Sequence, residues 1–306
     1  MNREGAWERF MEVKSKAGRS VGSTLGSYWD ALGQLFRAYP DLKNLEDFTA
    51  EKIERWLLNL HVSQRSKAIR RKQINVFFNW CSKRGLIEEN PVERVETITA
   101  PKADREAFTP REIERLKQLA EGDLGVAIEY LLHGLRPGEF CSLKPENLDL
   151  EAGVIRVFRR KTREFQNIEL FDRLKEMIEN VKNFGLDAYA NPDDEKEARR
   201  KQWALFKDFK ALCKKAGVPN EKAILYTLRH TAATKLAAEW QDPFRLMGQM
   251  GWTNIRQAET YVHGSQRTIW AKVVSKSDAI AEMNAKIDKI LAWVEKFEEI
   301  KSFVET

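Results

Sequence analysis

The sequence predicts a mainly α-helical fold with one small antiparallel β-sheet, divided into two domains. Apolar residues recur at helical spacing in most segments. One stretch, residues 153–170, instead has two runs of strand composition around a polar turn, which is typical of a β-hairpin. The length of 306 residues exceeds what a single hydrophobic core usually serves, so two domains are expected.

Residues 1–95 predict an all-helical first domain. Helices are expected over residues 5–17, 22–39, 49–60 and 66–84. Thr49 reads as the N-cap of the third helix, and Gly85 ends the fourth. Asn90-Pro91 then stops regular structure. One apolar face of the second helix is expected to comprise Leu25, Tyr28, Trp29, Leu32, Leu35 and Phe36.

Residues 96–108 lack a helical period and predict a linker. The second domain then begins at Thr109, which precedes a proline and Glu112 in a pattern typical of a helix N-terminus. Later helices lead to Gly134, where the chain must turn so that Leu135 points into the core and Arg136 points out.

The second domain is expected to extend to residue 275 and to contain the hairpin, with Lys161 at its tip. A polar break at residues 191–197 is followed by a predicted helix from Lys201 to Lys215 that Gly217 terminates. The inward face of that helix is expected to carry Trp203, Phe206, Phe209 and Leu212.

The C-terminal stretch, residues 276–306, has an apolar stripe with alternating intervals of three and four residues, about three heptads long. Such a stripe packs against its own domain or against a neighbouring protomer, and we favour an oligomerisation element. The stripe consists of Ile280, Met283, Ile287, Ile290, Val294 and Phe297.

Charge gives weak support for a polyanionic partner. The chain has 52 Lys/Arg and 46 Asp/Glu, a net charge of +6, and residues 1–100 hold 17 − 13 = +4 of it. This balance suits DNA but also fits many soluble enzymes. A cluster of basic residues at the start of the fourth helix forms either a solvated face or a set of phosphate contacts. It comprises Arg65, Lys67, Arg70, Arg71 and Lys72.

The three cysteines, Cys81, Cys141 and Cys213, have neither Cys-x-x-Cys spacing nor clustered histidines, so disulfides and zinc sites are not expected. No signal-peptide pattern appears, and no run approaches the ~18 apolar residues of a membrane span. A cytoplasmic protein without a membrane partner is the simplest prediction.

Three separate stretches carry the candidate chemistry. They read LLHGLRPGEFCSL, LYTLRHTAATKLA and MGWTNIRQAETYVHG, and they contain Arg136, Arg229 and Tyr261. Two guanidinium groups and one phenol are what an enzyme needs to hold a phosphodiester and attack it without a metal. Each residue alone also has a structural explanation, whereas the three in this order are harder to explain structurally.

This order resembles the tyrosine recombinase (phage integrase) family over about the first 275 residues. The first family box reads GLRPGE here, and the second, usually His-x-x-Arg-His, runs from Tyr226 through Arg229 to His230. The Gly251-Trp252 pair precedes Tyr261, which follows Trp252 by nine residues, the family spacing.

The resemblance implies a two-domain, C-shaped DNA clamp, with a helical core-binding (SAM-like) domain at 1–95 and a catalytic domain at 109–275. It implies a site-specific DNA recombinase that forms a 3′-phosphotyrosine intermediate and a Holliday junction. The implied partners are double-stranded DNA attachment sites and further copies of the chain. A homotetramer is expected on synapsed DNA and a monomer or dimer in free solution, associated with the nucleoid and needing no cofactor or metal.

The resemblance also assigns roles. Tyr261 is the nucleophile, Arg136 and Arg229 neutralise the phosphate, and Lys161 is the general acid for the leaving oxygen. Trp252 donates a ring N–H to the phosphate, and Glu139 orients Arg136. His230 and His263 are supporting residues. The expected DNA contacts are the five basic residues of the fourth helix together with Arg159, Arg160 and Arg163.

Tyr226 departs from the family pattern, because it replaces the first histidine of the second box. A phenol with a pKa of about 10 is a poor base at neutral pH, although it can still hydrogen-bond a phosphate. Such substitution occurs among archaeal members, which points to an archaeal virus or plasmid integrase. Two alternatives remain: a catalytically weakened DNA-binding regulator, and a topoisomerase-like nicking-closing enzyme.

Overall fold

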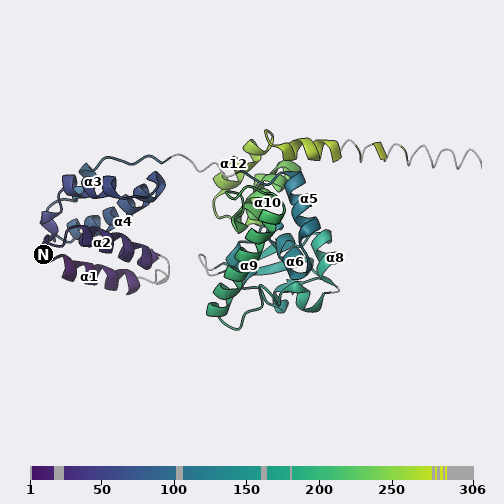
Figure 1. Cartoon of the computed structure of the whole chain (residues 1–306), viewed down its shortest axis with the longest axis horizontal. Helices are drawn as coiled ribbons and strands as arrows, with labels where there is room; N and C mark the ends of the chain where they lie inside the picture. The colour runs from purple at the N-terminus through teal and green to yellow at the C-terminus, as the bar shows by residue number, and fades with distance from the viewer. Residues whose placement is uncertain are drawn as a thin grey trace, which may run out of the picture. The chain divides into compact units, whose positions relative to one another are not determined.

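The computed structural model describes residues 2–16, 24–100, 106–159, 164–179, 181–277, 280, 283, 284 and 287. Its contacts divide the chain into two compact units, Met1–Asp104 and Arg105–Thr306 (Figure 1). The first unit has one hydrophobic core. The second has a large core and a smaller cluster around its last helices. Within the described residues, no helix combines the length and apolarity needed to cross a membrane.

Helices that enclose an aromatic core form the first unit. The ring centroids of Phe10 and Phe77 lie 5.3 Å apart in an edge-to-face arrangement, which aromatic pairs favour. Thr49 is the N-cap predicted from the sequence, and Gly85 has a φ of +65°. The helices are α1 (Arg3–Lys16), α2 (Gly26–Ala38), α3 (Ala50–Asn59) and α4 (Gln64–Ser82), with 3₁₀ turns at Leu45–Asp47 and Pro91–Arg94.

The predicted apolar face of α2 is confirmed except at Trp29, whose side chain is 55% exposed. This residue lies at the edge of the face, and its ring packs against Trp7 with centroids 4.4 Å apart and planes tilted by 40°. The other five residues of the face are buried.

In the second unit, the largely buried helix α10 (Leu225–Trp240) packs against α6 (Gly122–Leu132), α11 (Pro243–Met250) and α12 (Ile255–Ser265). Figure 1 shows α10 in the middle of this unit. The capping box predicted at Thr109 is present at the start of α5. Other helices of this unit are α5 (Pro110–Leu119), α6 (Gly122–Leu132), α7 (Pro137–Phe140), α8 (Asp172–Glu179), α9 (Glu195–Lys215), α11 (Pro243–Met250) and α12 (Ile255–Ser265), with 3₁₀ turns at Pro145–Asn147 and Lys182–Gly185. Residues 269–277 are also helical.

The predicted hairpin is confirmed. Strands β1 (Leu148–Asp149), β2 (Val154–Arg159) and β3 (Glu164–Glu169) form an antiparallel sheet in the order β1-β2-β3. Val157 pairs with Gln166, and alternation along β2 turns Val157 and Arg159 to the buried face. The hairpin tip, with Arg160, Lys161 and Arg163, lies outside the described residues.

Helix α9 differs from its prediction in two respects. It begins before the expected start at Lys201, because the Asp194 side chain caps it by accepting a first-turn N–H at 2.7 Å. Trp203, expected to point inward, is 63% exposed. At 100° per residue it lies about 120° around the helix from the buried Phe209.

The three cysteines are buried and well separated in the sequence. Burial raises the pKa of each thiol, at Cys81, Cys141 and Cys213, to about 12, so none is a reactive thiolate near neutral pH.

His133, just after α6, is buried, and this burial opposes its protonation. Its Nδ1 lies 2.8 Å from the carbonyl oxygen of Glu129, and its ring packs 4.7 Å from that of Phe171. Burial lowers the pKa of His133 to about 4, although the neighbouring Glu129 carbonyl and carboxylate act in the opposite direction. The carboxylate is itself paired with Lys117 at 2.7 Å.

This burial predicts a pH-dependent loss of stability. An unfolded histidine has a pKa of about 6.5, so the unfolded chain takes up a proton before the folded one does as the pH falls. The free energy of unfolding should therefore drop between about pH 6.5 and pH 4, by on the order of 3 kcal/mol. His133→Gln should flatten this decline. Urea unfolding of both proteins at pH 7, 5.5 and 4 measures it, and parallel declines in the two proteins would refute the prediction.

Candidate active site

The turn between α6 and α7 delivers Arg136 to the surface of the core. Gly134 has a φ of +97°, and a Cβ there would lie 2.7 Å from the Met250 sulfur, so only glycine fits. Leu135 is fully buried, whereas the side chain of Arg136 is about a third exposed, as predicted. The backbone N–H of Arg136 donates to Glu139 Oε2 at 2.8 Å, and its Nη1 donates to Oε1 at 2.6 Å.

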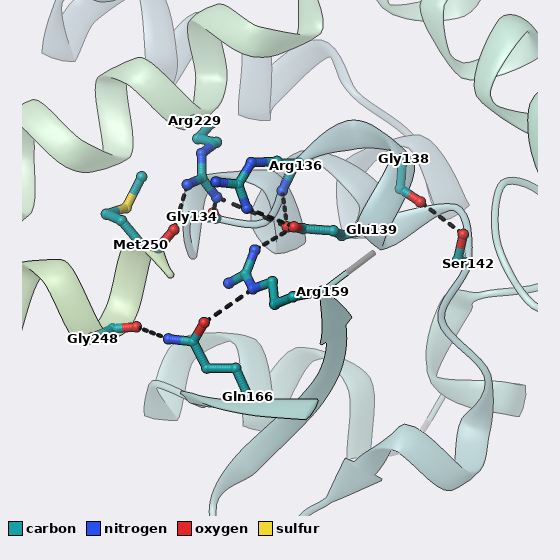
Figure 2. A network of polar contacts seen from close by, with 10 residues as sticks. All are labelled: Gly134, Arg136, Gly138, Glu139, Ser142, Arg159, Gln166, Arg229, Gly248 and Met250. Atoms are coloured by element: carbon teal, nitrogen blue, oxygen red, sulfur yellow. Dashed lines mark hydrogen bonds and ion pairs between the residues drawn. The ribbon is translucent and has the colours of Figure 1, made fainter. Parts of the chain in front are cut away.

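Arg229 lies on α10 and is only 6% exposed. Its terminal nitrogens donate to the carbonyl oxygens of Gly134 and Met250, and Nη1 lies 3.9 Å from Glu139 Oε2 (Figure 2). Burial, reinforced by the nearby positive charge of Arg136, lowers the pKa of Arg229 to about 9. The guanidinium is therefore still charged at neutral pH.

Arg159 joins the same carboxylate from β2. Its Nη1 donates to Glu139 Oε1, and its Nε donates to Gln166 Oε1 at 3.0 Å (Figure 2). Gln166 in turn donates to the carbonyl oxygen of Gly248, which ties the hairpin to α11. A Cβ at Gly251 would lie 2.1 Å from Arg159 Nη2, so the guanidinium packs directly on that glycine.

Arg159, expected among the DNA contacts, lines the cavity beside the cluster but is otherwise enclosed by the protein. The residue is 6% exposed and is held inside the protein by Glu139 and Gln166. Sequence reasoning did not identify Gln166 as part of the site.

The carboxylate of Glu139 thus lies within 4 Å of three guanidinium groups, those of Arg136, Arg159 and Arg229. Burial on its own would raise the pKa of Glu139, but Arg159, together with the N–H and guanidinium of Arg136, outweighs it and lowers the pKa. Three positive charges and one negative charge leave a local excess of +2. This excess can be neutralised by an anionic ligand such as a phosphodiester.

Tyr261, on α12, belongs to a second cluster. Its Oη lies 2.8 Å from Nδ1 of His230 on α10, within hydrogen-bonding distance. Its ring stacks on Trp252 with centroids 5.1 Å apart and planes 24° apart. All three side chains are half-buried, whereas His263, near the end of α12, is exposed.

A cavity of about 780 Å³ opens beside the arginine cluster. Its lining includes Arg136, Glu139, Arg159, Tyr226 and Trp252. Tyr226, in the first turn of α10, is 45% exposed. Tyr261 is not among the described lining residues, and Trp252 connects the two groups because it both lines the cavity and stacks on Tyr261.

The basic residues of α4 fall into two sets. Arg71 donates to the carbonyl oxygens of Val92 and Val95 at 3.1 and 2.7 Å. Similarly, Arg70 donates to Gln34, and Lys67 donates to the carbonyl oxygen of Leu58. These contacts hold the three side chains against the first unit, and the expectation that all five basic residues contact DNA stays a prediction. Arg65 and Lys72 are exposed.

Comparison with known proteins identifies the family. Residues 106–267, which are 162 of the 306, match the phage integrase family. The chain belongs to the phage integrase family. Membership confirms the enzyme class inferred from the motifs, a tyrosine-type site-specific recombinase.

Integrase-family relatives match most of the chain. A tyrosine recombinase of Pseudothermotoga lettingae is 22% identical over 262 residues, covering 83% of this chain and 90% of the relative. A structure of a lambda integrase (75–356) dimer bound to a COC′ core site superposes with a TM-score of 0.69 at 19% identity, covering 86% of this chain and 95% of that one.

A lambda integrase tetramer bound to a Holliday junction also superposes, with a TM-score of 0.69 at 20% identity and coverage of 83% and 78%. These superpositions confirm the predicted fold class, mainly α with a small antiparallel sheet.

Proposed function

We propose that this integrase-family chain cleaves and rejoins DNA at specific sites through a covalent bond between Tyr261 and a 3′-phosphate. The observation that carries the proposal is the excess of positive charge around Glu139, which opens on a cavity that also reaches Trp252. Trp252 stacks on the phenol ring of Tyr261, so the phosphate cradle and the nucleophile are neighbours.

The chemistry follows from these groups. As the Tyr261 oxygen attacks phosphorus, its bond to phosphorus forms and the bond from phosphorus to the 5′-oxygen breaks. Arg136 and Arg229 stabilise the charge that develops on the nonbridging oxygens. The 5′-oxygen takes up a proton, for which Lys161 is the proposed donor. Attack by the 5′-hydroxyl of a partner strand reverses the step, so the protein–DNA bond conserves the energy of the cut strand.

DNA binding and assembly extend the proposal. The exposed Arg65 and Lys72 of α4 are the proposed phosphate contacts of the first unit. Because lambda integrase forms a tetramer on a Holliday junction, a tetramer is the assembly we propose here. In the C-terminal stripe, Ile280, Met283 and Ile287 are exposed and suit packing against another protomer. The rest of the stripe, Ile290, Val294 and Phe297, lies outside the described residues.

A covalent-capture experiment tests the function. The wild-type chain is incubated with sheared DNA from the organism that encodes it, and protein-linked fragments are recovered under denaturing conditions and sequenced. Recurrent junctions at one sequence are the expected result, and that sequence supplies a nicked duplex for kinetic work. Sequence-specific binding with no covalent product would instead support a DNA-binding regulator.

Tyr226 gives a prediction for the second family box. Because Tyr226 is half exposed and lines the cavity, we expect it to hydrogen-bond the phosphate rather than to support the fold. Tyr226→His should keep or increase the rate of covalent-complex formation, since an imidazole can make the same bond. Single-turnover cleavage of the nicked duplex measures this rate, and complete loss of cleavage would show that the phenol has a dedicated role.

A further inference from the structure

The hydroxyl of the proposed nucleophile has a titratable partner. Nδ1 of His230 lies 2.8 Å from the Tyr261 oxygen, and the two rings are 5.4 Å apart at 64°. A phenol must lose its proton as it attacks phosphorus, yet with a pKa of about 10 it is almost fully protonated at neutral pH. An imidazole, with an ordinary pKa of about 6.5, is well suited to accept that proton at hydrogen-bonding distance.

Tyr226 cannot take this role, because a second phenol is no stronger a base than the first. Tyr226 and His230 are four residues apart, so they lie on the same side of α10 one turn from each other. On this side of α10, Tyr226 lines the cavity. One turn further on, the imidazole of His230 contacts the Tyr261 hydroxyl.

The surroundings hold the pair in place. His230 is fixed on a buried helix, and its carbonyl oxygen accepts a hydrogen bond from Thr234 at 2.9 Å. The Tyr261 ring also stacks on Trp252, so it contacts an indole as well as the imidazole. Among the described titratable groups, Tyr261 from α12 contacts the imidazole, and Tyr226 lies one turn away on the same side of α10.

We infer that His230 is the general base that activates Tyr261. Nδ1 accepts the phenol proton while the bond from oxygen to phosphorus forms and the bond to the 5′-oxygen breaks. When a 5′-hydroxyl rejoins the strand, the imidazolium returns the proton to the departing tyrosine oxygen. The 5′-oxygen takes its own proton from a separate acid, so each proton has a donor and an acceptor and no co-reactant is needed. This inference rests on the proposed function.

The test is a pH profile of single-turnover covalent-complex formation on the nicked duplex recovered by covalent capture. His230→Asn keeps a hydrogen-bonding amide near the position of Nδ1 but cannot accept a proton. The wild-type rate should fall as the pH is lowered and the imidazole becomes protonated. His230→Asn should lower the rate at pH 7.5 by about 10²- to 10⁴-fold and abolish this acid limb. Duplex affinity and thermal midpoint should match the wild type.

A control variant sharpens the result. His61→Asn replaces an exposed histidine between α3 and α4 and should keep the wild-type rate and profile.

The inference is overturned if His230→Asn cleaves within about threefold of the wild-type rate, or if it is slow but keeps the acid limb. It is also overturned if the limb disappears in His263→Asn instead. Absence of any covalent product from the wild type would refute the proposed function itself, which keeps the two failures distinct.

Discussion

Tyr261→Phe is expected to form no covalent complex with DNA, while its affinity for the same duplex stays within about twofold of the wild type. Phenylalanine keeps the ring that stacks on Trp252 but removes the oxygen that attacks phosphorus. The lost hydrogen bond to His230 should cost about 1 kcal/mol of stability, too little to unfold the protein. A denaturing gel after incubation with the nicked duplex detects the covalent complex, and an equilibrium binding assay gives the affinity.

Tyr189→Phe is the matched control. The Tyr189 hydroxyl donates to Asp208 at 2.8 Å. Neither residue is among the residues that line the cavity beside the arginine cluster. This variant loses a comparable hydrogen bond and should cleave like the wild type. A covalent band that persists in Tyr261→Phe would move the nucleophile to another residue.

Glu139→Gln should both destabilise the second unit and abolish cleavage. The substitution removes the only carboxylate within the described cluster, where Arg136 pairs at 2.6 Å, Arg159 donates to the same oxygen, and Arg229 lies 3.9 Å away. Removing one partner of a buried ion pair costs about 3–5 kcal/mol, because the remaining charges stay desolvated and unpaired. We expect a loss of this size in urea unfolding, and a fall in the cleavage rate of at least about 100-fold.

An exposed ion pair provides the comparison. Glu51 pairs with Arg55 at 2.8 Å on α3, and both side chains are mostly exposed. Glu51→Gln should change stability by less than about 1 kcal/mol and leave cleavage unaltered. If Glu139→Gln proved as stable as Glu51→Gln, the shared carboxylate would not be what holds the three arginines together.

Much of the fold could be predicted from local chemistry. The capping box at Thr109 and the turn at Gly134 follow from backbone requirements that a few neighbouring residues reveal. The hairpin follows from strand composition on both sides of a polar turn. By contrast, the exposure of Trp203 depends on which side of α9 meets the core, and the run of aromatic residues alone did not show it.

The candidate site was predicted in part. Motifs identified Arg136, Arg229 and Tyr261, but they did not show that Arg159 shares the carboxylate of Glu139. The sequence did contain a clue to the role of Arg159. Alternation along β2 places Arg159 on the same buried face as Val157, and a charged residue on a buried face needs a partner. The partner is 20 residues away in the sequence, so only tertiary structure reveals it.

Arg229 also has a structural role, because its guanidinium bridges the carbonyl oxygens of Gly134 and Met250 and so ties the turn after α6 and the end of α11 to α10. Substitutions of Arg229 should therefore be among the most damaging in a genetic screen. They remove a proposed phosphate ligand, and they also destabilise the second unit. A variant that removes DNA cleavage without disturbing the fold is better made at Tyr261.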